Sequence, residues 1–170
     1  MLADTNIYAK LKGFLLSEHH EMTKSRIMYA FSSLVRGDNT ATSHLLKSGD
    51  LLDMATLFHK STRNLNLAEK LLSFVTDIMN PAMESSNKAN EIHNVPFLEI
   101  IGLNEWCTIF EHVIMKSPST SLQSIGMEGL RVVLERRSCP LTVTFKEWVL
   151  NRWDFDETLK EDLKFLESHI

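Results

Sequence analysis

Residues 23–37 read TKSRIMYAFSSLVRG, and later parts of the chain repeat the pattern of this stretch. Its apolar side chains occupy the helical spacing i, i+3, i+4 and i+7, namely Ile27, Ala30, Phe31 and Leu34. This spacing predicts a helix with one apolar face. A second stripe on the opposite side is polar around one aromatic ring: Arg26, Tyr29, Ser33 and Arg36. Gly37 stands where a C-terminal cap belongs. The stretch alone fits an ordinary core helix equally well.

The same apolar spacing returns further along the chain at Leu71, Phe74, Val75 and Ile78. The offset from Ile27 to Leu71 is 44 residues (71 − 27), which lies within the period of armadillo and HEAT repeats. Asn66 followed by Glu69 is a capping-box signature for the start of this second long helix. We predict a short helix over Thr40–Lys47, a medium one over Asp50–Lys60 and the long one over Asn66–Met79. This order favours the armadillo type.

These patterns predict an all-α fold, a right-handed armadillo/HEAT-like helical-repeat solenoid with a C-terminal helical cap, in a single domain over residues 1–170. The repeats run over 4–37, which is partial, 38–80 and 95–138, and the cap over 143–170. The partial repeat begins with a helix over Thr5–Ser17, whose expected apolar face is Ile7, Leu11, Phe14 and Leu15. Because a solenoid that begins in mid-repeat exposes an apolar end, we expect further chain before residue 1.

After the second long helix, the pattern is interrupted by a polar insert. Pro81 ends that helix, and residues 80–94 are expected to form a surface loop or a frayed helix. Apolar spacing resumes over residues 95–101, and a helix is predicted over Leu103–Met115 with a core face of Trp106, Ile109, Phe110 and Val113. A long helix over Pro118–Arg137 contains Gly126 and Gly129, which would let a neighbouring helix approach closely.

The C-terminal cap is predicted from two further helix starts, at Thr144 with Glu147 and at Asp154 with Glu157. One side of these helices is heavily apolar: Trp148, Trp153, Phe155, Leu159, Leu163 and Leu166. The other side supplies the polar outer face that a terminal repeat requires: Lys160, Glu161, Asp162, Lys164 and Glu167.

Composition and charge narrow the class of partner. The chain has 170 residues, of which 44% are hydrophobic and 24% charged, values typical of a globular domain with a sizeable core. Its formal net charge of −4 disfavours a nucleic-acid partner, because phosphate binding needs basic clusters. No run of about 18 apolar residues is present, so no membrane insertion is expected. The first ten residues lack signal-peptide features, which indicates an intracellular protein or a piece of a longer chain.

The cysteines and histidines give no sign of a chemical centre. Cys107 lies in an apolar helix and is expected to be a packed thiol, while Cys139 stands in a turn before Pro140 where exposure is expected. A bridge between the two is the less favoured alternative, since one pair makes no disulfide framework. His19 and His20 are neighbours on the chain and do not share a metal ion easily, and the other histidines lack a second ligand at helical spacing.

Motifs of catalysis are also missing from the sequence. It contains no GxxxxGK[ST], no GxGxxG and no GxSxG. No catalytic residue, cofactor site or metal site is therefore predicted. A binding scaffold is favoured over an enzyme.

The stretch SRIMYAFSSLVRGDNTATSHLLKSGDLLDM resembles the core repeat of the armadillo-type nucleotide exchange factors of BiP-like heat-shock chaperones. Met28–Arg36 and Thr40–Gly49 are similar to that family's long helix and the short helix after it, and FVTDIM resembles the next repeat. Gly102–Ile114, with its Trp-Cys pair, is most like the branch in the lumen of the endoplasmic reticulum. DETLKEDLKFLESHI is similar to the family's closing helix, so the chain resembles the C-terminal half of such a protein.

Some features depart from that family. Gly49-Asp50 stands where Gly-Gly is usual, and family members carry further repeats and an N-terminal region. The lumenal branch also carries a signal sequence and usually a C-terminal retention tetrapeptide, which Glu167–Ile170 is not. These departures fit a fragment. The endoplasmic reticulum lumen is the compartment that the resemblance implies, with the cytoplasm as the alternative.

The resemblance implies an adenyl-nucleotide exchange factor, a co-chaperone in protein folding and protein transport without catalysis of its own. Such a protein clasps the ATPase domain of a BiP-type chaperone, one to one, and favours an open arrangement of the two lobes that hold ADP. ADP then leaves and ATP enters. The factor and ADP therefore bind antagonistically, and the coupling is reciprocal.

The helical pattern indicates where the partner would bind. In an armadillo stack the long third helices line the concave side, so the stripes opposite their apolar faces meet the partner. The candidates are Arg26, Tyr29, Ser33 and Arg36 from the first long helix, Lys70, Ser73 and Asp77 from the second, and Glu128 or Arg131, depending on register, from the third. Tyr29 is favoured as a contact, since an exposed aromatic in a groove is a typical anchor. Arg26, Lys70 and Glu128 fit merely solvated positions equally well.

An alternative function is an armadillo scaffold that binds an extended peptide or another protein in its concave groove. Nuclear-import and adhesion armadillo proteins use repeated Asn and Trp side chains on their third helices. Here Ser33 and Asp77 take the Asn positions, and Tyr29 and Ser73 the Trp positions. The ladder is missing, which disfavours this alternative.

Overall fold

A computed structural model describes residues 3–61, 63–80, 100–135, 139–151 and 160–170. Within these ranges the regular secondary structure is entirely α-helical, which confirms the predicted all-α class. The helices are α1 (Ala3–Ser17), α2 (Glu21–Gly37), α3 (Asn39–Lys47), α4 (Asp50–Lys60), α5 (Leu65–Met79), α6 (Leu103–Lys116), α7 (Thr120–Glu135), α8 (Val143–Leu150) and α9 (Lys160–Glu167). Residues 81–99 and 152–159, which hold the polar insert and the start predicted at Asp154, lie outside the described ranges.

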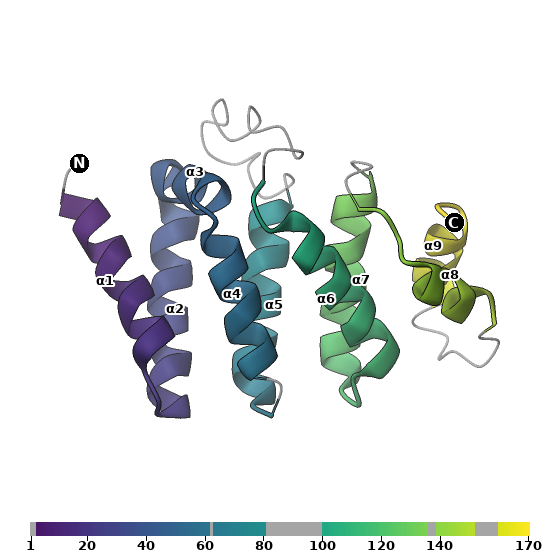
Figure 1. Ribbon diagram of the computed structural model, residues 1–170, viewed down its shortest axis with the longest axis horizontal. Helices are drawn as coiled ribbons and strands as arrows, with labels where there is room; N and C mark the ends of the chain where they lie inside the picture. The colour runs from purple at the N-terminus through teal and green to yellow at the C-terminus, as the bar shows by residue number, and fades with distance from the viewer. Residues whose placement is uncertain (1–2, 62, 81–99, 136–138, 152–159) are drawn as a thin grey trace.

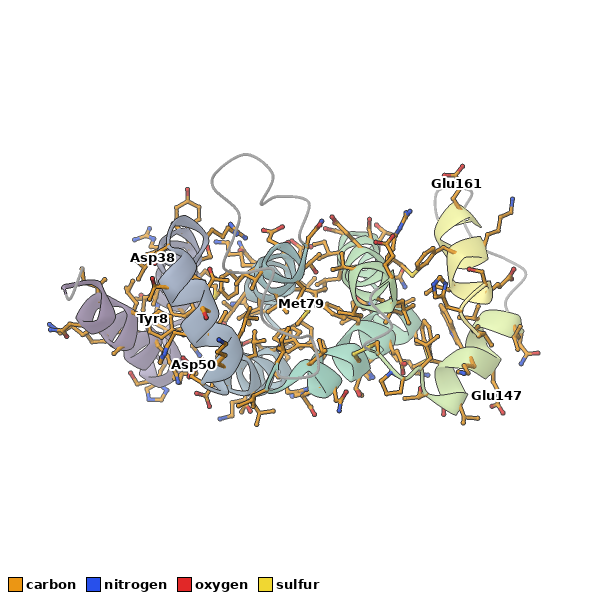
Figure 2. All side chains as sticks on the ribbon, turned by 90° about the horizontal axis from the view of Figure 1, so that it is seen from above. Tyr8, Asp38, Asp50, Met79, Glu147 and Glu161 are labelled. Carbon is orange, nitrogen blue, oxygen red and sulfur yellow. A yellow bond between two sulfur atoms is a disulfide. The ribbon has the colours of Figure 1, made fainter. Side chains whose placement is uncertain are left out.

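The helices are arranged in two rows, and the chain termini lie at opposite ends of the molecule (Figure 1). Figure 2 shows the two rows from above, with α2, α5 and α7 in one and α4 and α6 in the other. Within the first row α5 packs against both α2 and α7, and across the rows α1 packs on α2, α4 on α5 and α6 on α7. The short helix α3 contacts α2 and α4, and α8 and α9 pack against α6 and α7. The α2–α5–α7 row therefore has one side on the core and one side open.

The buried face of α2 differs from the predicted one. Met28, Phe31 and Val35 are fully buried, whereas Ala30 is exposed and Ile27 and Leu34 are only partly buried. The reason is that α2 packs against α1, α3 and α5 together, so its buried arc is set by three neighbours and is centred about one residue away from the predicted stripe. Among the predicted core positions of α5, Leu71, Phe74 and Val75 are fully buried.

The predicted apolar face of α1 is also partly wrong. Leu15 is buried and Leu11 partly buried, but Ile7 is 47% and Phe14 59% exposed. Tyr8, which the pattern had not included, is only 5% exposed. The side of α1 that meets the rest of the molecule carries Tyr8 and Leu15, which are spaced i and i+7 and therefore share one helix face.

Three helix starts differ by one or two residues from their predicted positions. Asn64 rather than Asn66 caps α5, since its side chain accepts a hydrogen bond of 3.1 Å from the Leu67 N–H. Thr142 rather than Thr144 caps α8 through the Phe145 N–H. The helix α7 begins at Thr120 rather than Pro118, after Ser119 accepts from the Leu122 N–H. In each case several capping side chains stand close together, and tertiary packing selects among them.

Glycines allow close approach at two places. A Cβ at Gly129 of α7 would lie 2.5 Å from Phe110 Cε1 and 2.8 Å from Thr76 Oγ1, so the predicted close approach of neighbouring helices is confirmed there. Gly102 precedes α6 with φ of 92°, and a Cβ there would lie 3.1 Å from the backbone nitrogen of Leu52. A side chain would be strained in that left-handed conformation and crowded against α4.

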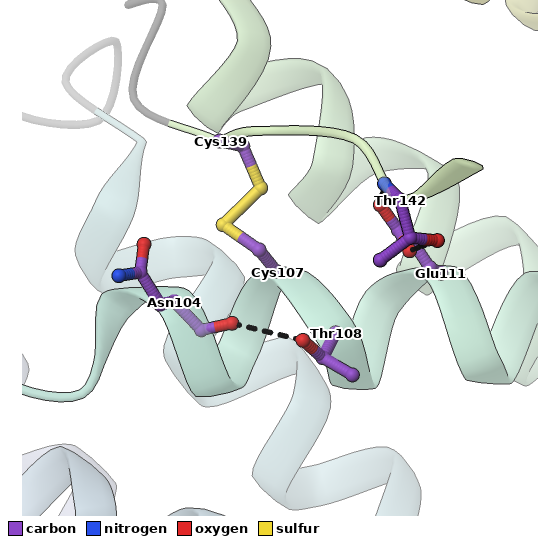
Figure 3. The surroundings of a disulfide bond; sticks show 6 residues. All are labelled: Asn104, Cys107, Thr108, Glu111, Cys139 and Thr142. Carbon is purple, nitrogen blue, oxygen red and sulfur yellow. Dashed lines mark hydrogen bonds between the residues drawn. A yellow bond between two sulfur atoms is a disulfide. The ribbon is translucent and has the colours of Figure 1, made fainter. Parts of the chain in front are cut away.

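Two connections fasten the segment before α8 to α6 (Figure 3). Cys107 and Cys139 form a disulfide, with their Cα atoms 5.8 Å apart. One helical turn further along α6, the buried Glu111 accepts hydrogen bonds from the Thr142 N–H at 2.9 Å and from the Thr142 hydroxyl at 2.6 Å. The expectation of a packed thiol at Cys107 and an exposed Cys139 is therefore wrong: the pair is bridged, and Cys139 is 8% exposed. The bridge depends on α6 and the returning chain meeting in space, which no local pattern shows.

Candidate interface on the face of α2, α5 and α7

The polar stripe predicted on α2 lies on the open side of its row. Arg26, Tyr29, Ser33 and Arg36 are all exposed, and Tyr29 has 69% of its surface accessible. The stripe stays open because α1, α3 and α5 cover the other sides of the helix. An aromatic ring that projects from an otherwise polar helix face is a suitable anchor for a protein partner.

A hollow of about 350 Å³ connects this stripe with the neighbouring helices. Its lining comes from three helices of one row: Tyr29, Ser32 and Arg36 of α2, Asn66, Glu69, Lys70 and Ser73 of α5, and Ile125 of α7. The structure thus brings together four of the predicted contact residues, Tyr29, Arg36, Lys70 and Ser73. Arg26, Ser33, Asp77 and Glu128 do not line it.

The other half of the lining was not predicted. Asn66 and Glu69 had been interpreted as a capping box, but the helix begins one residue before Asn66, so both side chains are free to face the hollow. Their spacing of i and i+3 with Ser73 at i+7 was a signal in the sequence for one helix face. Ile125 reaches the hollow only because α7 packs against α5, which no local pattern indicates.

An ion pair connects Arg36, which lines the hollow, to Asp77, which lies outside its lining. The Arg36 guanidinium of α2 pairs with the Asp77 carboxylate of α5, and its central carbon lies 5.8 Å from the centre of the Phe74 ring. Burial raises the pKa of Asp77 above its usual range, although the positive charge of Arg36 acts in the opposite direction. Arg36 thus already has a carboxylate partner within the protein, and this partly exposed pair joins α2 to α5.

Other charges around the hollow lack such partners. Glu69 and Lys70 are half-buried, and within the described ranges neither forms an ion pair or a side-chain hydrogen bond. Neighbouring residues on a helix do not face each other, so these two charges do not neutralise one another. The hollow consequently offers one unpaired carboxylate and one unpaired ammonium group.

The third helix contributes less than predicted. Glu128 of α7 is exposed but lies outside the hollow's lining. Its alternative, Arg131, pairs with Glu135 at 3.2 Å and lies over the Phe165 ring of α9 at 5.0 Å. Arg131 is thus engaged in docking α9.

A second polar cluster, missed by the sequence analysis, joins α1 to α4. Asp50 is 5% exposed, accepts a hydrogen bond of 2.5 Å from the Tyr8 hydroxyl and pairs with Lys12. Lys12 also pairs with Asp53 at 2.8 Å. Burial raises the pKa of Asp50, but the hydrogen bonds from Lys12 and Tyr8 outweigh it and hold that pKa below the usual range. The signals were the spacing of Tyr8 and Lys12 at i and i+4 and an acidic residue at the start of an apolar helix.

The described part of the chain shows neither a candidate metal site nor a helix suited to span a membrane. It contains no group of three or more histidine, cysteine or acidic side chains placed to hold a metal ion. Among its helices, none combines the length and the apolar character needed to cross a bilayer. The features that the described residues do offer are a hollow with unpaired charges and an exposed aromatic ring.

Comparison with known proteins adds no relative. The chain matches no family model, no curated protein and no solved structure at a significant level.

Proposed function

We propose that this chain is an armadillo-type nucleotide exchange factor for a BiP-type heat-shock chaperone, and that it binds the chaperone's ATPase domain with the face of α2, α5 and α7. The observation that carries the proposal is the hollow shared by these three helices, with Tyr29 exposed at its edge. It lies on the helices on which the resemblance to that family places the partner. Catalysis by the chain itself is not part of the proposal.

The order of helices supports the armadillo interpretation. The helices α3, α4 and α5 have 9, 11 and 15 residues, the short, medium and long order of that repeat. The long helix α7 packs beside α5 as α5 packs beside α2, so like elements are neighbours. Stacking of like elements is how repeat proteins build one continuous binding surface.

The mechanism would be antagonism between two ligands of the chaperone. The factor would favour an open arrangement of the ATPase lobes, and ADP a closed one, so each weakens the binding of the other by the same factor. A coupling free energy of about 3 kcal/mol would weaken ADP on the order of 150-fold. A preformed surface suits this task, since the binding energy is then available for displacing the lobes.

The disulfide supports a lumenal site of action. Structural disulfides form and persist in oxidising compartments, and cytosolic thiols are kept reduced. The Cys107–Cys139 bridge is nearly buried and joins two helical units, as a structural bridge does. We therefore propose the lumen of the endoplasmic reticulum, where BiP-type chaperones work, as the compartment of this protein.

The test is the release of a fluorescent ADP analogue from the chaperone's ATPase domain, followed with and without the 170-residue chain. We expect the wild-type chain to accelerate release, and Tyr29→Ala to weaken binding by about 2 kcal/mol or more, as loss of a central aromatic anchor does. Val143→Ala is the matched control, because Val143 is 71% exposed on α8, outside the proposed interface. Release that the wild-type chain leaves unchanged would contradict the proposal. If the wild-type chain and Tyr29→Ala accelerate ADP release equally, the assignment of the interface to the face of α2, α5 and α7 is wrong.

A further inference from the structure

The charged side chains that line the hollow are of two kinds: one forms an ion pair within the protein, and the others do not. Arg36 has an internal carboxylate partner in Asp77 and an aromatic ring beside it. Glu69 and Lys70 have no partner within the described ranges, although both line the hollow. Glu69 and Lys70 lie about two turns before Asp77 on α5, and Arg36 lies on the neighbouring helix α2, so the two groups share one surface but not one role.

An unpaired charge that is half-buried is less well hydrated than one that projects freely into water. Such a charge contributes most to the free energy of binding when the partner brings an opposite charge to it. A like charge from the partner is strongly repelled and weakens binding. Glu69 and Lys70 point in different directions from the helix, so each can meet its own counter-charge. Arg36 gains little from a further carboxylate, because Asp77 already supplies one.

We propose that Glu69 and Lys70 determine which partner surface the hollow accepts: one that presents a basic side chain to Glu69 and, beside it, an acidic side chain to Lys70. Arg36 is a positioning residue that holds α2 to α5 through Asp77, and its charge is not read by the partner. This inference rests on the proposed function, since it concerns the same face and the same partner domain.

Two charge exchanges separate these roles, and both keep the formal net charge of −4. The variant Glu69→Lys/Lys70→Glu exchanges the unpaired charges. The variant Arg36→Asp/Asp77→Arg exchanges the paired ones and keeps an internal ion pair. Affinity for the chaperone's ATPase domain is measured by calorimetry with the full chain, and thermal melting checks that each variant is folded.

We expect the Glu69/Lys70 exchange to weaken binding by at least about 100-fold with unchanged melting, because like charges would then meet across the interface. The Arg36/Asp77 exchange should weaken binding by no more than about 5-fold, as expected for a partly exposed pair whose charges already neutralise each other. If the Glu69/Lys70 exchange binds as the wild type does, while Tyr29→Ala binds weakly, the assignment of these charges is wrong and the proposed function stands. If the wild-type chain itself does not bind, both are wrong. A loss of binding by the Arg36/Asp77 exchange at unchanged melting would show that the partner reads Arg36.

Discussion

The two ends of the molecule are fastened to its middle by different chemistry. At the N-terminal end, α1 is joined to α4 by the buried carboxylate of Asp50, which meets Tyr8 and Lys12. At the C-terminal end, the segment before α8 is joined to α6 by the Cys107–Cys139 disulfide and by Glu111. Both connections reach across the sequence, over 42 residues from Tyr8 to Asp50 and over 32 between the cysteines.

The difference decides which conditions loosen each end. A network of charges and hydrogen bonds depends on protonation, whereas a disulfide depends on reducing agents. Neither end relies on apolar contacts alone: α1 leaves Ile7 and Phe14 exposed, and α8 leaves Val143 and Leu150 exposed. The middle, from α4 to α7, holds most of the largest fully buried side chains, among them Phe74, Trp106 and Phe110. We therefore expect that each end can be weakened while the middle stays folded.

The largest effect on stability is expected from Asp50→Ala. It leaves the Tyr8 hydroxyl without its acceptor and Lys12 with Asp53 alone, and breaking a buried pair in this way costs about 4 kcal/mol. Urea unfolding at neutral pH measures the loss, and hydrogen exchange should show faster exchange in α1 than in α8 and α9. The control is Asp53→Ala, whose side chain is 47% exposed and whose loss should cost less than about 1 kcal/mol. Equal effects of the two variants would contradict a central role for Asp50.

A slightly smaller effect is expected from Cys107→Ala/Cys139→Ala. The bridge closes a segment of 32 residues, for which loss of the cross-link costs about 3.5 kcal/mol by the loop-entropy estimate. Hydrogen exchange should now rise in α8 and α9 and stay unchanged in α1, the reverse of Asp50→Ala. Reduced wild-type protein serves as the control, because it lacks the bond without any change of residue. Exchange that rises equally at both ends would show that the two connections are not independent.

Much of the helical structure was predictable because its causes are local. The spans Thr40–Lys47 and Asp50–Lys60 agree with α3 and α4 to within one residue, and the predicted core of α6 is buried at every position. Apolar spacing and capping side chains act within one or two helical turns. Helix starts were less certain where several capping residues stand together, as at Asn64 and Asn66.

The contacts between distant segments were not predictable in the same way. Phe31 was expected in the core and is there, but Ala30 beside it is exposed, because three neighbouring helices set the buried arc of α2. Tyr8 and Asp50 are unremarkable until α1 and α4 are placed side by side. At the candidate interface, the exposed stripe of α2 followed from periodicity, whereas Ile125 entered through the packing of α7. Such contacts depend on tertiary geometry, which a single sequence does not encode in any local window.

The smallest effect on stability is expected from Tyr8→Phe. The pH dependence of this effect tests whether the N-terminal connection, unlike the disulfide at the other end, depends on protonation. Removing the hydroxyl loses one hydrogen bond to a charged acceptor, worth about 1.5 kcal/mol at neutral pH, and keeps the ring against Phe31. Burial, and then the hydrogen bond to Asp50, raises the pKa of Tyr8 above its ordinary value of 10.0. A raised pKa contributes stability that is fully present below the unfolded value and is lost as the pH rises above it. The stability of the wild type should therefore fall towards that of Tyr8→Phe between neutral pH and pH values above about 10.

Guanidinium unfolding of both proteins across this pH range measures the difference in stability. The cysteine double variant, which keeps Tyr8, should show the same decline as the wild type. A difference between wild type and Tyr8→Phe that stays constant with pH would mean that the hydroxyl does not donate to Asp50.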